Sequence, residues 1–170
     1  MDVEAPEFTP DEERCMRAAM EQAQSAYAAG EVPVGAIVVD AAGALIGAGF
    51  NSTITDHDPS AHAEIVALRQ AAAALKNYRL PGATVFVTLE PCAMCMGAML
   101  HARVSRVVYA ATDPKTGACG SVLSVHDNLR LNHHTTVRGG LLANECGEML
   151  RQFFRERRNA GRGADPSGGT

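Results

Sequence analysis

The segment at residues 84–110, TVFVTLEPCAMCMGAMLHARVSRVVYA, decides the fold. Its first part, Thr84–Leu89, is rich in β-branched and aromatic residues and therefore predicts a strand. Residues 93–101 predict a helix, and residues 104–110 predict the next strand. A strand, a helix and a strand in succession are typical of an α/β protein, in which helices cover a sheet.

The segments before this unit predict a helix, a hairpin and a second helix. Thr9, followed by a proline and three acidic residues, is a typical start for a helix over residues 11–29. The apolar runs at 34–39 and 44–50 flank a turn and predict an antiparallel hairpin. Residues 63–75 are rich in alanine and leucine and predict a buried helix.

The C-terminal part of the chain adds a weak strand at residues 135–138 and a long helix at 142–158. Because the hairpin is antiparallel, the sheet is expected to be mixed. The predicted fold is a three-layer α/β/α sandwich around a mixed five-stranded sheet. Residues 11–158 are expected to form one domain, residues 1–10 a flexible acidic N-terminus and residues 159–170 a disordered tail.

Length and composition agree with a single globular domain. The chain has 170 residues, of which 46% are hydrophobic and 20% charged. No uninterrupted apolar run approaches the ~20 residues of a membrane helix, so no membrane partner is expected. The acidic N-terminus is unlike a signal peptide, and the odd number of cysteines, 5, favours thiols over disulfides. A cytoplasmic location is therefore expected.

Charge is distributed unevenly along the chain. The net charge is -4, but residues 1–13 contain only acidic charges, whereas five arginines and one glutamate lie within residues 151–162. This basic end suits a phosphate backbone, although a solvated helix face is the commoner explanation of such a run taken alone.

Cys92 and Cys95 have the spacing of a metal chelate. Residues at i and i+3 at the start of a helix face the same side, and the positive end of the helix favours thiolates. The pair alone also fits a redox motif or two buried cysteines. His62, at the start of another helix, supplies a third ligand, and a His-Cys-Cys set leaves the fourth position of a tetrahedral zinc site open, as in catalytic sites.

Glu64 lies two residues after His62 and is expected to point in a different direction from the ligands. A carboxylate in this position can reach a water molecule on the metal without binding the metal itself. Glu64 is therefore predicted to carry protons during catalysis. Taken alone, either residue fits a polar helix end, and the combination with the two cysteines favours the catalytic interpretation.

These residues together resemble a known signature. His62-Ala63-Glu64, followed by Pro91-Cys92-Ala93-Met94-Cys95, resembles the HxE and PCxxC motifs of the zinc-dependent nucleobase deaminases. Further stretches are similar to the bacterial tRNA-specific adenosine deaminases, over roughly residues 11–158. They read EVPVGAIVV, HDPSAHAEIVALRQA, NYRL, DPKTGACGS and FFRERR.

The resemblance implies a cytidine deaminase-like α/β fold, an activity and a cofactor. Adenosine at the wobble position of a tRNA anticodon would be converted to inosine, with one Zn2+ per subunit. Zinc hydroxide would attack C6 of adenine while Glu64 protonates N1 and then helps ammonia to leave. The family also implies a homodimer and the tRNA anticodon stem-loop as partner.

The resemblance also assigns contacts with the RNA. Asn51 and the backbone N–H of Ala63 would bind the target purine. The other matched positions are His57, Asp113, Lys115, Phe153, Arg155, Arg157 and Arg158. Since adjacent helix residues do not share a face, one residue of the phenylalanine pair at 153–154 is expected to be in the core.

Two other interpretations remain open from the sequence. One is a deaminase of the same fold that acts on a free base such as guanine or cytosine, which would not need the arginine-rich last helix. The other is a non-catalytic, zinc-stabilised RNA-binding module. The intact Glu64 and the missing fourth protein ligand argue against the second.

Overall fold

A mixed sheet of five strands forms the centre of the molecule. The computed structural model describes residues 7–162. Along the chain the elements are α1 (Pro10–Ala28), β1 (Gly35–Val39), β2 (Leu45–Phe50), α2 (Ala63–Leu75), β3 (Thr84–Leu89), α3 (Ala93–His101), β4 (Arg106–Ala111), the short 3-10 helix η1 (Val125–Asp127), β5 (Thr136–Gly139) and α4 (Ala143–Arg162).

The strand order is β2-β1-β3-β4-β5. Strand β1 pairs antiparallel with both β2 and β3, whereas β3, β4 and β5 run parallel to one another. This confirms the predicted hairpin and the mixed sheet. Because β3 and β4 are parallel, the loops that follow them leave the sheet at the same edge.

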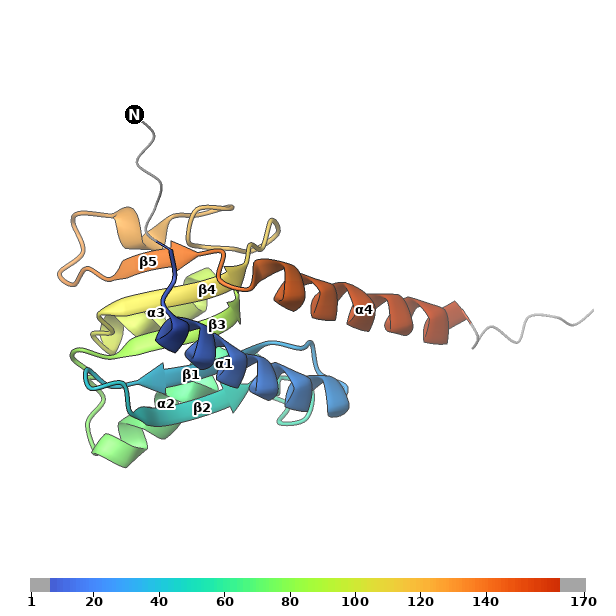
Figure 1. Ribbon diagram of the computed structural model, residues 1–170, viewed down its shortest axis with the longest axis horizontal. Helices are drawn as coiled ribbons and strands as arrows, with labels where there is room; N and C mark the ends of the chain where they lie inside the picture. The colour runs from blue at the N-terminus through green and yellow to red at the C-terminus, as the bar shows by residue number, and fades with distance from the viewer. Residues whose placement is uncertain (1–6, 163–170) are drawn as a thin grey trace, which may run out of the picture.

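Alternating side chains of the strands fill two separate cores. On one face, Val38, Val85 and Val107 pack with residues of α2 and α3. On the other face, Phe86 and Val108 pack with α1 and the start of α4. Figure 1 shows this arrangement, with α1 in front of the sheet and α2 and α3 behind it. The predicted three-layer α/β/α sandwich is confirmed.

Helices α1 and α2 lie so close to the hairpin that only glycine fits beneath them. A Cβ atom at Gly35 would lie 2.0 Å from the carbonyl oxygen of Ala19 in α1, and one at Gly47 would lie 2.4 Å from that of Ala67 in α2. Close backbone approach of this kind is a regular use of glycine within strands.

The start of α1 is fixed by a capping box. The Thr9 hydroxyl accepts a hydrogen bond from the backbone N–H of Glu12, and the Glu12 carboxylate accepts one from the backbone N–H of Thr9. Glu12 also forms an ion pair with Arg106 at the start of β4. Burial raises the pKa of Glu12, but hydrogen bonds from Thr9 and Arg106 outweigh this effect and leave the pKa below its ordinary value.

Several predicted boundaries shift. The capped Thr9 and the helical Pro10 belong to the fold, so the N-terminus predicted to be flexible is shorter than residues 1–10; residues 1–6 lie outside the described part. Strand β4 begins at Arg106 because Arg103 has a positive φ of 59° and the N–H of Val104 is bonded to Met99, which closes α3.

The C-terminal boundary differs more. Helix α4 continues to Arg162, four residues into the segment that was predicted to be disordered from residue 159. Ala160 favours helix, and an arginine in the last turn interacts favourably with the helix dipole. Residues 163–170 lie outside the described part. Among the helices of residues 7–162, none combines the length and the apolar composition that crossing a membrane requires.

Candidate active site

The three predicted zinc ligands meet at the starts of two helices. His62 is the N-cap of α2, Cys92 is the N-cap of α3, and Cys95 lies in the first turn of α3. Neither N-cap side chain makes a capping hydrogen bond to its own helix. Both are therefore available to a ligand between the two helices.

The distances within this cluster fit a tetrahedral zinc site. The His62 Nδ1 atom lies 3.6 Å from the Sγ atoms of both Cys92 and Cys95. Zinc bonds of ~2.3 Å to sulfur and ~2.1 Å to nitrogen at tetrahedral angles give a nitrogen-to-sulfur separation of about 3.6 Å. All three ligand atoms lie within 4.8 Å of one another. The donor set and its dimensions thus suit zinc and leave one position open.

The protonation of the two thiols supports the same conclusion. A hydrogen bond from Cys95 and a further one from His62 lower the pKa of Cys92 to about 4. The same contact with Cys92, together with burial, raises the pKa of Cys95. Two thiolates this close repel each other, and a divalent cation between them allows both to ionise.

Glu64 lies beside the cluster without joining it. Its side chain is buried, and its Oε2 atom accepts a hydrogen bond of 3.4 Å from the Cys95 thiol. Burial raises the pKa of Glu64. A raised pKa lets a carboxyl group hold a proton more readily than an exposed glutamate does, and a proton carrier must be able to take up a proton.

A cavity of about 260 Å³ opens onto these residues. The predicted site residues that line it are Asn51, His62, Ala63, Glu64, Cys92 and Asp113. Ala63 is the first residue of α2, so its N–H has no partner within the helix and is available to a ligand. His57 is exposed on the loop between β2 and α2 and does not line this cavity.

Asp113 holds its own loop in shape. Its carboxylate accepts hydrogen bonds from the backbone N–H groups of Lys115 and Thr116 at 3.0 and 3.3 Å and from the Thr116 hydroxyl at 2.9 Å. Lys115 points into a neighbouring cavity of about 390 Å³, which it shares with residues of α4.

The two phenylalanines of α4 have different roles. Phe153 is only 4% exposed, and its ring lies 5.4 Å from that of Tyr27 in an edge-to-face contact. The side chain of Phe153, which the resemblance assigns to RNA contact, holds α4 against α1 in the structure. Phe154 is 43% exposed and lines the cavity that contains Lys115. The prediction that one member of the pair is in the core is confirmed.

The arginines of α4 also separate into two groups. Arg155 and Arg158 line the cavity with Lys115, together with Arg151, which the sequence did not single out. Arg157 instead donates a hydrogen bond to the carbonyl of Gly30 and lies over the Phe153 ring. It therefore fastens α4 to the end of α1.

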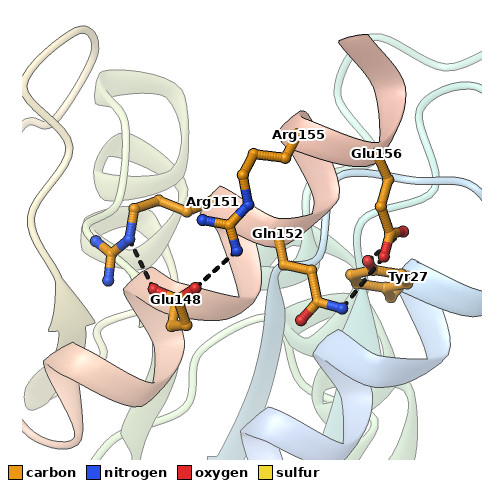
Figure 2. Close-up of polar contacts among 6 residues, drawn as sticks. All are labelled: Tyr27, Glu148, Arg151, Gln152, Arg155 and Glu156. Carbon is orange, nitrogen blue, oxygen red and sulfur yellow. Dashed lines mark hydrogen bonds and ion pairs between the residues drawn. The ribbon is translucent and has the colours of Figure 1, made fainter. Parts of the chain in front are cut away.

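Part of the positive charge of α4 is neutralised by its own acidic residues. Figure 2 shows the Glu148 carboxylate between Arg151 and Arg155, at 3.0 and 2.9 Å from their guanidinium groups. Glu156 accepts hydrogen bonds from Gln152 and from the Tyr27 hydroxyl. The periodicity of residues 151, 155 and 158 along one helix face is the signal that could have identified Arg151 from the sequence.

Comparison with known proteins agrees with this site. The profile of the cytidine and deoxycytidylate deaminase zinc-binding region matches residues 9–111. A tRNA-specific adenosine deaminase of Haemophilus influenzae is 51% identical over 147 residues, which cover 86% of this chain and 85% of the relative.

Solved structures give the same picture. One from studies of A-to-I editing by tRNA deaminases at the wobble position of transfer RNA has a TM-score of 0.77 and 41% identity, over 80% of this chain and 98% of the other. A guanine deaminase from Nitrosomonas europaea has a TM-score of 0.74 and 28% identity, over 88% of this chain and 86% of the other.

Proposed function

The chain belongs to the family of cytidine and deoxycytidylate deaminases with a zinc-binding region, and we propose that it converts adenosine to inosine at the wobble position of a tRNA anticodon. The observation that carries the proposal is the His62, Cys92 and Cys95 cluster with Glu64 beside it, in a chain 51% identical to a tRNA-specific adenosine deaminase.

His62, Cys92 and Cys95 would hold the metal. When bound there, zinc supplies an activated water molecule for hydrolysis. Glu64 would carry one proton from water to N1 of adenine and a second proton, from the hydroxyl group added at C6, to the amino group that leaves as ammonia. Because these charges develop only during the reaction, Glu64 is complementary to the transition state rather than to the planar base.

The remaining residues of the cavity orient the base. The backbone N–H of Ala63 and the side-chain amide of Asn51 provide hydrogen-bonding groups at the cavity wall. An asparagine amide can donate to and accept from a purine edge, so Asn51 is suited to fix which face of the purine meets Glu64.

The surface beside the cavity suits single-stranded RNA. Lys115, Arg155 and Arg158 provide positive charge, and the exposed ring of Phe154 provides a stacking surface among them. Helix α4 extends well past the sheet (Figure 1), so it can follow nucleotides that leave the active site. His57, on the loop before His62, is proposed to contact a nucleotide on the other side of the cavity mouth.

Two further properties belong to this proposal. The resemblance to the tRNA-specific deaminases supports a homodimer, which would appear in sedimentation equilibrium at twice the mass of one chain. It also supports a cytoplasmic location, where the tRNA substrate is found.

The test is a substrate panel with the purified, zinc-loaded protein. An anticodon stem-loop with adenosine at the wobble position is compared with the same stem-loop carrying guanosine there, and with free adenosine, guanine and cytosine. Inosine in the stem-loop and no conversion of the free bases is the expected result. Conversion of guanine with an unreacted stem-loop would instead support the free-base alternative, to which the Nitrosomonas europaea similarity points.

A further inference from the structure

Two buried glutamates that are not zinc ligands hold two loops that line the 260 Å³ cavity, and one of them, Glu90, lines the cavity itself. One wall contains Asn51 and Thr53, from the loop after β2, and another contains Asp113 and Thr116, from the loop after β4. Glu31 is 0% exposed and Glu90 is 2% exposed.

Glu31 binds the first loop from the segment between α1 and β1. Its Oε1 atom accepts hydrogen bonds from the backbone N–H groups of Ile54 and Thr55, at 2.9 and 2.8 Å, and from the Thr55 hydroxyl at 3.2 Å. The residues bound in this way directly follow Thr53. Glu31 therefore fixes the backbone of the first wall.

Glu90 binds the second loop at both of its ends. Its Oε2 atom accepts a hydrogen bond of 2.8 Å from the backbone N–H of Asp113 and one from the Ser121 hydroxyl. Its Oε1 atom accepts bonds from the backbone N–H groups of Cys119 and Ser121, at 3.0 and 3.1 Å. The whole of residues 113–121 is thus wrapped around one carboxylate.

The contact between this loop and Glu90 is close enough to require glycine. A Cβ atom at Gly117 would lie 2.4 Å from the carboxyl carbon and from Oε2 of Glu90. The loop keeps other attachments, because Gly117 forms a β-bridge with Cys92 and the N–H of Ala118 bonds to the Pro91 carbonyl. Loss of the Glu90 contacts would therefore loosen the loop without detaching it.

All donors to both carboxylates are backbone amides or hydroxyls. Burying a carboxylate is costly unless its oxygens are hydrogen-bonded, so each glutamate stays favourable only while its loop is in place. Most of these hydrogen bonds come from the loop backbone. They can therefore order the loops independently of any ligand that the loop side chains bind. The zinc ligands are the N-cap residues of α2 and α3 and Cys95 in the first turn of α3, and none of them is among the residues that donate to the two glutamates.

We propose that Glu31 and Glu90 are positioning residues for the substrate, which hold the two cavity walls at the spacing that the target nucleotide requires. They act through the loops and do not exchange protons with the reacting base. The proposal deepens the proposed function and rests on it for the identity of the substrate.

The experiment compares Glu31→Gln, Glu90→Gln and the matched control Glu12→Gln in the zinc-loaded protein. Glu12 is also a partly buried carboxylate with an ion-pair partner, Arg106, but it lies at the opposite edge of the sheet. For each variant, the zinc content, the hydrogen exchange of backbone amides, and KM and kcat on the anticodon stem-loop are measured.

Glu31→Gln and Glu90→Gln should each lose protection from hydrogen exchange only in the loop that the replaced glutamate binds. Amide exchange should rise roughly tenfold at residues 54 and 55 in Glu31→Gln, and at 113, 119 and 121 in Glu90→Gln, the equivalent of one charge-assisted hydrogen bond. KM should rise by a similar factor while kcat changes less than about threefold, because a misplaced wall weakens binding and leaves the chemistry intact. Zinc content should be unchanged, and the control should alter neither loop exchange nor KM.

The proposal would be overturned if the loop amides of Glu31→Gln or of Glu90→Gln exchanged hydrogen at the wild-type rate. It would also be overturned if both variants had the wild-type KM. Gly117→Ala approaches the Glu90 contact from the loop side and should reproduce the Glu90→Gln result, so it decides the question if Glu90→Gln does not fold. If the wild-type protein forms no inosine, the proposed function fails, and the exchange measurement still accepts or rejects the anchoring of the loops.

Discussion

The adjacent phenylalanines of α4 should separate stability from RNA binding. Phe153 is 4% exposed and packs on Tyr27, so Phe153→Ala removes a buried ring and should lower the free energy of unfolding by about 3 kcal/mol. For a chain of this size, that corresponds to a melting temperature roughly 6–12 °C lower. Phe154 is 43% exposed, and Phe154→Ala should cost no more than about 1 kcal/mol.

The two substitutions should have the reverse order of effect on KM, with the larger change in Phe154→Ala. Loss of a stacked base costs ~1–3 kcal/mol, so Phe154→Ala should raise KM for the anticodon stem-loop about 5- to 150-fold. Phe153→Ala, assayed well below its melting temperature, should change KM far less. Urea unfolding and steady-state editing on the same preparations measure both quantities. A larger loss of stability in Phe154→Ala, or a larger rise in KM in Phe153→Ala, would refute the assignment of the two side chains.

Four further substitutions have defined outcomes. His62→Ala and Cys92→Ser should each bind less than one zinc per chain and form no inosine, and full zinc retention in both, measured by atomic emission, would contradict the ligand assignment. Glu12→Gln should be less stable than wild type at neutral pH. Because the folded-state pKa of Glu12 lies below the ordinary 4.5, the contribution of its carboxylate to stability is complete above pH 4.5 and is lost as the pH falls below that value. Urea-unfolding curves of the two proteins should therefore converge in acid. Glu148→Gln frees the guanidinium groups of two arginines on α4. The variant should bind the stem-loop more tightly in a filter assay, and its binding should depend more steeply on salt. Weaker binding would show that the Glu148 carboxylate holds the arginines in place for RNA.

The strand-helix-strand unit and the metal ligands could be predicted because their signals are local. The β-branched run of Thr84–Leu89 marks a strand, and the i, i+3 spacing of Cys92 and Cys95 places both thiols on one side of α3. His62 joins them because β2 and β3, on either side of the antiparallel β1, run in the same direction, so the segments that follow them leave the sheet at the same edge.

The roles of the α4 residues could not be predicted in the same way. Phe153 and Phe154 are chemically identical, and which one is buried depends on how α4 is rotated against α1. The same rotation turns Arg157 towards Gly30 and leaves Arg158 beside Lys115. The spacing of residues along α4 shows which of them share a face, but the contacts of each face with α1 and with the loop of Lys115 arise only in the folded protein.

The roles of the two buried glutamates could not be predicted from the sequence for a related reason. Glu31 bonds to residues 23 and 24 positions away, and Glu90 to residues 23 to 31 positions away. Such contacts exist only once the loops have closed, and in the sequence each residue resembles an ordinary solvent-exposed glutamate. Their burial is the observation that distinguishes them.

The most direct test of the proposed chemistry is inosine formation by wild type and Glu64→Gln on the same anticodon stem-loop, with zinc measured in both proteins. Glutamine has nearly the size of glutamate but cannot carry the proton, so the variant should retain about one zinc per chain and lose at least roughly a hundredfold in rate. Wild-type rates of inosine formation in the zinc-loaded variant would show that Glu64 is not the proton carrier and would contradict the account of the active site.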